Sequence, residues 1–243
     1  MKKLIILGMV LALLLPSAVL ADVLVDGWQD ATMDELQQAQ QDISNRISEL
    51  RAAASVDVDS VELSGSGTSI LSDVVIPFSP SRVIVECEDD TSVKFTGEEY
   101  DYTFSAKTRE ESFFSAVGTF DLLVESPGAW SVVVEPIMDG GTLPMNGNGP
   151  FVSDFFELPA PMIVSITADP AGMDAFLTNL IVKLHNQYEN IDSWGGDSLT
   201  NELLSTDDSF AADVILEPVD GRDQYCLSVT CEPGVEWSIA PKN

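Results

Sequence analysis

The sequence predicts a mainly β protein: two tandem antiparallel β-sandwich domains of jelly-roll-like layout, preceded by a signal peptide and one amphipathic helix. Two observations predict the domains. From Ser64 onward, apolar and polar residues alternate and turn residues recur, as in short half-buried strands. The same motifs also occur twice in the same order, which indicates a duplicated unit.

Two glycine-containing segments begin the repeat. SGSGTSILSDVVIPFSPSRVIVEC, at residues 64–87, aligns with NGNGPFVSDFFELPAPMIVSITAD, at residues 146–169, after a single-residue gap. Self-similarity of this kind outweighs local propensity as a guide to architecture. The alignment pairs Gly65 and Gly67 with Gly147 and Gly149, Ser72 and Asp73 with Ser153 and Asp154, Pro80 with Pro161, and Val83 and Val85 with Val164 and Ile166.

The two units also end alike. In each, an apolar strand is followed by Pro-Gly and then by Trp-Ser and a β-branched residue, in SPGAWSV and EPGVEWSI. A buried tryptophan contributes roughly 200 Å² to the core of a small domain. We therefore predict that Trp130 and Trp237 are structural residues, each covering the core of its own sandwich beneath the last strand.

Turn residues divide each unit into strands. The first domain, 64–139, is expected to hold strands near 69–78, 82–88, 92–96, 100–107, 113–125 and 130–136. The second domain, 140–243, is expected to hold strands near 151–158, 162–168, 176–186, 197–205, 210–217, 224–230 and 236–240, with an insertion near 186–213. The glycines of GSG and NGNG are expected to form turns ahead of the first strands.

The N-terminus is typical of an exported protein. Two lysines precede an uncharged apolar run that ends in small residues at Ala21, which predicts a secretory signal peptide at 1–21. The expected location is secreted, extracellular or at the cell surface. An uncleaved signal anchor is the alternative, because the run could just span a bilayer. No membrane insertion is expected unless the signal peptide is retained.

Residues 22–63 are predicted to form an amphipathic helix and a linker. TMDE at 32–35 is a capping box, and apolar residues follow at intervals of three and four. The resulting stripe is too short for a secure coiled coil. Packing on the first domain, a spacer, and self-association through the 32–51 helix all remain open.

The charge balance restricts the partners. The chain has 40 acidic and 11 basic residues, and its net charge is −29. Such a surface repels phosphate backbones, so nucleic acid is excluded as an expected partner. The expected ligand is an extracellular glycan or protein. The acidity is explained either by solubility or a salty habitat, or by a divalent cation or a basic partner.

Three cysteines are an odd number for an exported protein. Cys226 and Cys231 are five residues apart and point to opposite faces of a regular strand, so they cannot form a disulfide there. Alternation places Cys87 with Val83 and Val85 on one buried face. We predict three free thiols.

Calcium is the one metal that the composition favours, because it prefers hard oxygen ligands. No other cofactor is expected. A turn or a cap is the alternative interpretation of each repeated Ser-Asp pair. The candidate ligands are Asp89 and Asp90, Asp207 and Asp208, and the repeated Asp73 and Asp154.

A sugar-binding platform in the insertion is one of two interpretations of its aromatic residues. Trp194 precedes two glycines and has Tyr188 nearby, and exposed aromatic rings can stack on sugar rings. The alternative is that Trp194 anchors its loop to the core.

No catalytic residue is assigned. His185 is the only histidine and is expected to point outward at a strand end, without the motifs of a serine or cysteine hydrolase. A hydrolase that uses carboxylates alone needs only two suitably placed acids, and it remains an alternative function.

The paired glycines, the apolar first strand and the terminal PG…WS strand resemble the tandem jelly-roll sandwiches of exported bacterial proteins. Those include the pre-peptidase C-terminal type and carbohydrate-binding modules. The resemblance implies binding, surface attachment or spacing, with structural calcium in some members and no catalytic residue here. The predicted function is therefore an exported, non-enzymatic bacterial binding or structural module. A carbohydrate-binding protein that uses the Trp194 insert is an alternative.

Overall fold

A computed structural model of the chain describes residues 60–98, 101–172, 177–187, 196–219 and 222–242. Residues 59–243 form one compact unit. The predicted signal peptide, the predicted 32–51 helix, Tyr188 and Trp194 all lie outside the described residues. Among the residues that are described, no helix is long and apolar enough to cross a membrane.

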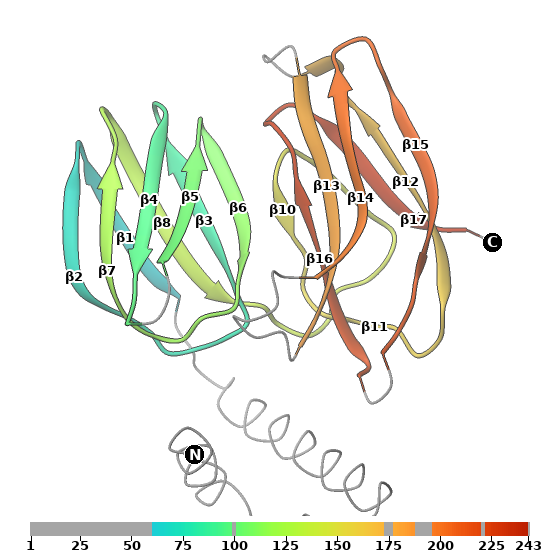
Figure 1. Ribbon diagram of the computed structural model, residues 1–243, viewed down its shortest axis with the longest axis horizontal. Coiled ribbons are helices and arrows are strands. Elements are labelled where there is room, and N and C mark those ends of the chain that lie inside the picture. Colours follow the sequence, from blue (N-terminus) through green and yellow to red (C-terminus); the bar gives the residue numbers. More distant parts are fainter. Residues whose placement is uncertain (1–59, 99–100, 173–176, 188–195, 220–221, 243) are drawn as a thin grey trace, which may run out of the picture. The chain divides into compact units, whose positions relative to one another are not determined.

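The first sandwich, strands β1–β8, has two four-stranded antiparallel sheets, in the orders β1-β8-β3-β6 and β2-β7-β4-β5. Figure 1 shows its strands in blue to yellow-green, with the two sheets facing each other. The strands are β1 (Val61–Ser66), β2 (Ser69–Ile76), β3 (Ser81–Cys87), β4 (Thr91–Thr96), β5 (Asp101–Ala106), β6 (Arg109–Phe114), β7 (Gly118–Glu125) and β8 (Ala129–Pro136).

The second sandwich, strands β9–β17, repeats this arrangement. One sheet has the order β9-β17-β12-β15, and in the other β10 and β11 both pair with β16, which is followed by β13 and β14 (Figure 1). The strands are β9 (Met145–Asn148), β10 (Phe151–Val152), β11 (Phe156–Glu157), β12 (Met162–Asp169), β13 (Leu177–Asn186), β14 (Asp197–Ser205), β15 (Phe210–Leu216), β16 (Gln224–Thr230) and β17 (Glu236–Pro241), and the 3₁₀ turn η1 (Pro170–Gly172) follows β12.

The duplication is confirmed strand for strand. β1 corresponds to β9, β2 to β10 plus β11, and β3 to β8 correspond in order to β12 to β17, because both sandwiches have the same sheet orders. The chain crosses between the two sheets of each sandwich as in a jelly roll. The expectation of two tandem antiparallel sandwiches is therefore confirmed.

The two tryptophans have the same surroundings. Trp130 pairs with Gly65 and donates its indole N–H to the Gly67 carbonyl at 2.9 Å. Trp237 pairs with Gly147 and donates to the Gly149 carbonyl at 2.8 Å. Both side chains are 4% exposed and belong to the core of their own sandwich. Their predicted structural role is confirmed.

The glycine motif is the other half of this contact. A Cβ atom on Gly65 would lie 2.5 Å from Trp130 Cζ2, and one on Gly147 would lie 2.4 Å from Trp237 Cζ2. The second glycine of each motif has a positive φ, +71° at Gly67 and +81° at Gly149, which suits glycine. The first glycine of each motif therefore leaves space for the indole ring, and the second glycine accepts its hydrogen bond.

This arrangement corrects one expectation. GSG and NGNG lie largely within β1 and β9, which pair with the tryptophan strands, and only Gly67 and Gly149 lie in the bends ahead of β2 and β10. Strand β1 begins at Val61, inside the segment predicted as a linker. Both strands were missed because glycine weakens a strand pattern in the sequence.

Two predicted strands are interrupted. The stretch 113–125 was expected to form one strand, but β6 ends at Phe114 and β7 begins at Gly118. The stretch 151–158 divides into β10 and β11 at Ser153 and Asp154, and the equivalent strand β2 changes register between Leu71 and Val74. The repeated Ser-Asp pair therefore marks an irregularity in a strand, closer to the turn interpretation than to a metal site.

The extra residues of the second sandwich are not confined to the predicted insertion near 186–213. Residues 197–205 and 210–216 form β14 and β15, which replace β5 and β6 and add no new element. β13 and β14 are longer than β4 and β5, so part of the extra length lies in strands of the shared fold.

Candidate functional site: a cleft between the sandwiches

Within the compact unit, Arg82 joins the two sandwiches. Its guanidinium binds Glu135 Oε1 of the first sandwich at 2.6 Å and Asp154 Oδ1 of the second at 2.9 Å. It also donates to the Val152 carbonyl at 2.8 Å. The rigid, planar donor set of arginine suits several acceptors at once. Asp154, predicted as a calcium ligand, is instead an ion-pair partner of Arg82.

An apolar contact lies beside this ion pair. Phe113 of β6 stacks on His185 of β13, with ring centroids 4.0 Å apart. Phe113 also packs on a small buried cluster that contains Ile137, Val152, Phe155 and Cys226.

This contact corrects the expectation for His185. The residue does lie on the outer face of its sheet, but it is only 2% exposed because the first sandwich covers that face. Its Nε2 is 2.8 Å from the Ser228 hydroxyl, which is also buried. A histidine–serine pair enclosed in this way lacks the access to substrate that a nucleophilic site needs.

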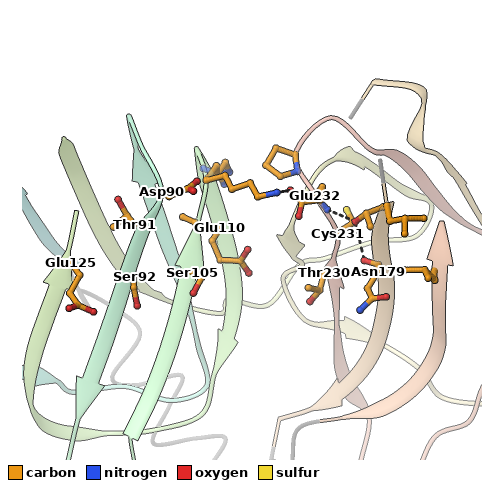
Figure 2. A pocket seen from close by; sticks show the side chains of 17 residues that line it. Asp90, Thr91, Ser92, Ser105, Glu110, Glu125, Asn179, Thr230, Cys231 and Glu232 are labelled. Atoms are coloured by element: carbon orange, nitrogen blue, oxygen red, sulfur yellow. Dashed lines mark hydrogen bonds and ion pairs between the residues drawn. The ribbon is translucent and has the colours of Figure 1, made fainter. Parts of the chain in front are cut away.

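Next to this contact the two sandwiches enclose a cleft of about 690 Å³ (Figure 2). From the first sandwich it is lined by Asp90, Thr91, Ser92, Ser105, Ala106, Lys107, Arg109, Glu110 and Glu125, and from the second by Leu177, Thr178, Asn179, Leu203, Thr230, Cys231, Glu232 and Pro233.

Strand pairing places a polar row along one wall. Ser92 of β4 pairs with Glu125 of β7 on one side and with Ser105 of β5 on the other, so the three side chains share the outer face of one sheet (Figure 2). On the other wall, Asn179 of β13 pairs with the exposed Leu203 of β14. The cleft thus lies between outer faces of equivalent sheets of the two sandwiches.

Both cations that line the cleft are ion-paired. Lys107 Nζ reaches across to Glu232 Oε2 of the second sandwich at 2.8 Å (Figure 2). Arg109 binds Glu86 and Glu111. The carboxylates of Asp90, Glu110 and Glu125 have no ion-pair partner among the described residues. The cleft is therefore net negative.

Glu110 has the most perturbed carboxyl group of the cleft. Burial, together with the nearby acids Glu111 and Glu232, raises its pKa to about 6, although a hydrogen bond from the Ser112 hydroxyl at 2.6 Å opposes the rise. A carboxyl group with this pKa titrates near neutral pH, which is common at functional sites.

None of Cys87, Cys226 and Cys231 forms a disulfide, as predicted. Cys226 belongs to the contact between the sandwiches and Cys231 to the core of the second, so they do face opposite ways. Burial, together with Glu110 and Glu232, raises the pKa of Cys231 to about 12, so it stays a thiol. Cys87 is half-buried against the first core.

The other predicted aspartates are not brought together. Asp73 occupies the irregular part of β2 with a φ of +60°, and Asp208 accepts a hydrogen bond from Ser205 in the turn after β14 with Asp207 beside it. Asp89 and Asp90 precede β4, and only Asp90 lines the cleft. In the part of the chain that the structure describes, no three His, Cys, Asp or Glu residues form a group that could hold a metal ion.

Most residues that line the cleft were not predicted from the sequence. Of the candidate residues that the structure describes, only Asp90 lines the cleft, while Glu110, Glu125 and Glu232 were not singled out. The available signal was weak, because each acid occupies an ordinary position at a strand or turn in a chain with 40 acids. Nothing local marks which acids face the other sandwich.

The sheets and the cleft define a tandem antiparallel β-sandwich protein. No family model matches the chain, and no curated protein matches it. A conserved protein of unknown function from Pseudomonas aeruginosa PAO1 is similar in structure, with 11% identity, a TM-score of 0.22 and coverage of 76% of this chain and 79% of that chain.

Two further solved structures are similar over comparable lengths. The N-terminal CBM22-1–CBM22-2 tandem domain of Paenibacillus barcinonensis Xyn10C has 11% identity and a TM-score of 0.26, with coverage of 75% of this chain and 85% of that chain. The stem and receptor binding domain of the bacteriophage PM2 spike protein P1 has 12% identity and a TM-score of 0.17, with coverage of 76% and 80%. These TM-scores are low, and the fold assignment rests on the strand order of the chain itself.

Proposed function

We propose that the protein is an exported, non-enzymatic binding module that holds a cationic ligand, such as a basic segment of another extracellular protein, in the cleft between its sandwiches. The observation that carries the proposal is the cleft itself. It is about 690 Å³ in volume, and among the described residues both of its cations are ion-paired while three of its carboxylates are not.

The chemistry of the lining supports a basic partner. The carboxylates of Asp90, Glu110 and Glu125 can accept charge-assisted hydrogen bonds from ammonium or guanidinium groups. Leu177 and Leu203, both exposed, offer apolar surface for the methylene groups of lysine or arginine. The net charge of −29 would attract such a ligand over a distance at low salt.

Export is supported by the sequence of residues 1–21, which has the basic start, apolar run and small residues of a signal peptide. An extracellular location is consistent with a module that meets its partner outside the cell. Detecting the chain in the culture medium, with Asp22 as its first residue, would test this part of the proposal. Retention of the chain in the membrane fraction would contradict it.

Calorimetric titration with a short oligolysine peptide tests the ligand class. Glu110→Gln and Glu125→Gln are each expected to weaken binding about tenfold, since each removes one carboxylate from the cleft. Glu157→Gln is the matched control, because Glu157 is an exposed acid on β11 outside the cleft lining. Equal weakening by all three variants would mean that the peptide responds to overall charge, and the proposal would fail.

One observation favours a second candidate, a carboxylate-dependent hydrolase. Glu110 has a pKa of about 6 and shares the cleft with Glu232, and a carboxyl group that is protonated near neutral pH can act as a general acid. Hydrolysis of aryl glycosides that is lost in Glu110→Gln would support this function. Intact oligolysine binding and no turnover by the unaltered chain would favour the binding module.

A further inference from the structure

The two sandwiches touch through two distinct surfaces, which we call the plug and the seat. The plug belongs to the first sandwich and consists of Arg82 on β3 and its cross-strand partner Phe113 on the edge strand β6. The seat belongs to the second sandwich and is the outer face around Val152, His185 and Cys226, which Arg82 and Phe113 contact.

Because the sandwiches are repeats, the second sandwich has its own plug position. Val83 and Val164 are equivalent, so the register of β12 with β15 places Ile163 where Arg82 stands and Ile215 where Phe113 stands. Ile163 and Ile215 are cross-strand partners and are 47% and 53% exposed. An exposed pair of large apolar side chains therefore occupies the plug position of the second sandwich.

The first sandwich correspondingly has its own seat. Leu123 is equivalent to Ser228, and their partners in the pairing register are Ile70 and Val152. Val152 is fully buried by the contact between the sandwiches, whereas Ile70 is 73% exposed. Leu123 beside it is half-buried. The seat of the first sandwich thus has the apolar pair Ile70 and Leu123 on the outer face of β2 and β7, with Thr96 and Asp121 at the positions of His185 and Cys226.

We propose that copies of this chain associate head to tail, with the Ile163–Ile215 plug of one copy packed against the Ile70–Leu123 seat of the next. The contact uses the same two surfaces as the one inside the chain, with the Ile163–Ile215 pair set on Ile70 and Leu123 in place of Val152 and Ser228. The second sandwich exposes the Ile163–Ile215 pair and the first exposes the Ile70–Leu123 pair. A second copy of the chain can therefore supply an apolar partner for each. A heterologous contact of this kind forms a ring or an open filament.

The flanking charges fit the same arrangement. Lys242 and Asp213 form an ion pair next to the plug, and Lys94 and Asp101 form one next to the seat. Each surface therefore presents both signs of charge beside its apolar pair. The net charge of −29 opposes association, so added salt should strengthen it by screening the repulsion.

Sedimentation velocity on the full chain over a range of concentrations tests the proposal. The average mass is expected to rise with concentration and to rise further with added sodium chloride. Ile215→Asp and Ile70→Asp are each expected to weaken association at least about tenfold. Val117→Asp is the matched control, because Val117 is exposed but lies beyond the opposite end of β2 from Ile70.

A mixture of the two variants separates a head-to-tail contact from a symmetric one. Ile215→Asp keeps an intact seat and Ile70→Asp keeps an intact plug, so an equimolar mixture should form a one-to-one dimer that grows no further. Failure of the mixture to form dimers would overturn the proposal. So would a wild-type chain that stays monomeric, or association that survives both substitutions, which would instead point to the predicted 32–51 helix.

Discussion

In each copy of the repeat, one glycine determines how closely the tryptophan ring can approach the backbone. Gly65 and Gly147 lie under Trp130 and Trp237, and a second glycine carbonyl in each motif accepts the indole N–H. A large side chain thus fills the core while its one polar atom keeps a hydrogen bond. Trp and Gly recur together because the indole ring can lie this close to the backbone only where the facing residue has no Cβ atom.

Gly65→Ala is expected to destabilise the first sandwich by about 1–3 kcal/mol, because its Cβ would displace the Trp130 ring in a packed core. Gly147→Ala should act in the same way on the second sandwich. Urea unfolding measures the loss, with exposed Ser66→Ala on the same strand as the control. Unchanged midpoints in the glycine variants would show that the indole can move at little cost.

Glu110→Gln is expected to alter the pH dependence of stability. The folded pKa of Glu110 is raised from 4.5 to about 6, so the stability that its protonated form contributes is present below pH 4.5 and is lost as the pH rises through 6. At pH 8 the amide should stabilise the protein by up to about 2 kcal/mol, and at pH 4 by little. Unfolding midpoints across this range check the difference, and a gain that does not depend on pH would contradict it.

Edge strand β6 contributes to the core of the first sandwich and also contacts the second sandwich. Its residues alternate between the core, with Phe114, and the second sandwich, with Phe113, while Glu111 accepts the backbone N–H of Val152 at 2.9 Å. The edge is thereby covered, which removes an exposed strand from solvent. The equivalent edge strand β15 carries Ile215, which is 53% exposed among the described residues.

Phe113→Ala is expected to expose Cys226, which is fully buried in the contact between the sandwiches. Labelling with a thiol reagent, in a Cys87→Ser background, should become at least about tenfold faster than in the parent, as the opening free energy falls. Thr103→Ala, on the outer face of β5, is the control. An unchanged labelling rate would mean that other contacts alone keep this surface closed.

On the scale of the whole molecule, charge opposes compactness. The chain has 40 acidic and 11 basic residues, so most carboxylates have no cation to pair with. Two of the described ion pairs, Arg82 with Asp154 and Lys107 with Glu232, join the two sandwiches. Net charge this far from zero keeps a chain soluble but makes the folded state repel itself.

Raising the ionic strength from about 0.01 M to about 0.1 M is therefore expected to raise Tm by a few degrees, because the screening length falls from about 30 Å to about 10 Å. Sodium chloride and potassium chloride should act alike in a thermal scan. A Tm that falls with salt would contradict this account. A large rise with calcium alone would instead indicate a bound ion, as the aspartate clusters led us to expect.

The sequence by itself determined the duplication, the two antiparallel sandwiches, the buried position of both tryptophans and the lack of a disulfide among the three cysteines. These features depend on alternation and on motifs that repeat in order, and local residues encode both. It did not show β1 and β9, because their glycines serve a partner some 63 residues or more away.

Only the tertiary structure decided the site. The burial of His185, the ion pair that engages Asp154, and the grouping of Glu110, Glu125 and Glu232 around one cleft all arise where the outer face of one sandwich meets the other. An outward-facing residue looks the same in the sequence whether water or another domain lies beyond it. The physical reason is that alternation encodes the inside and outside of each sheet, but not which outside becomes an interface.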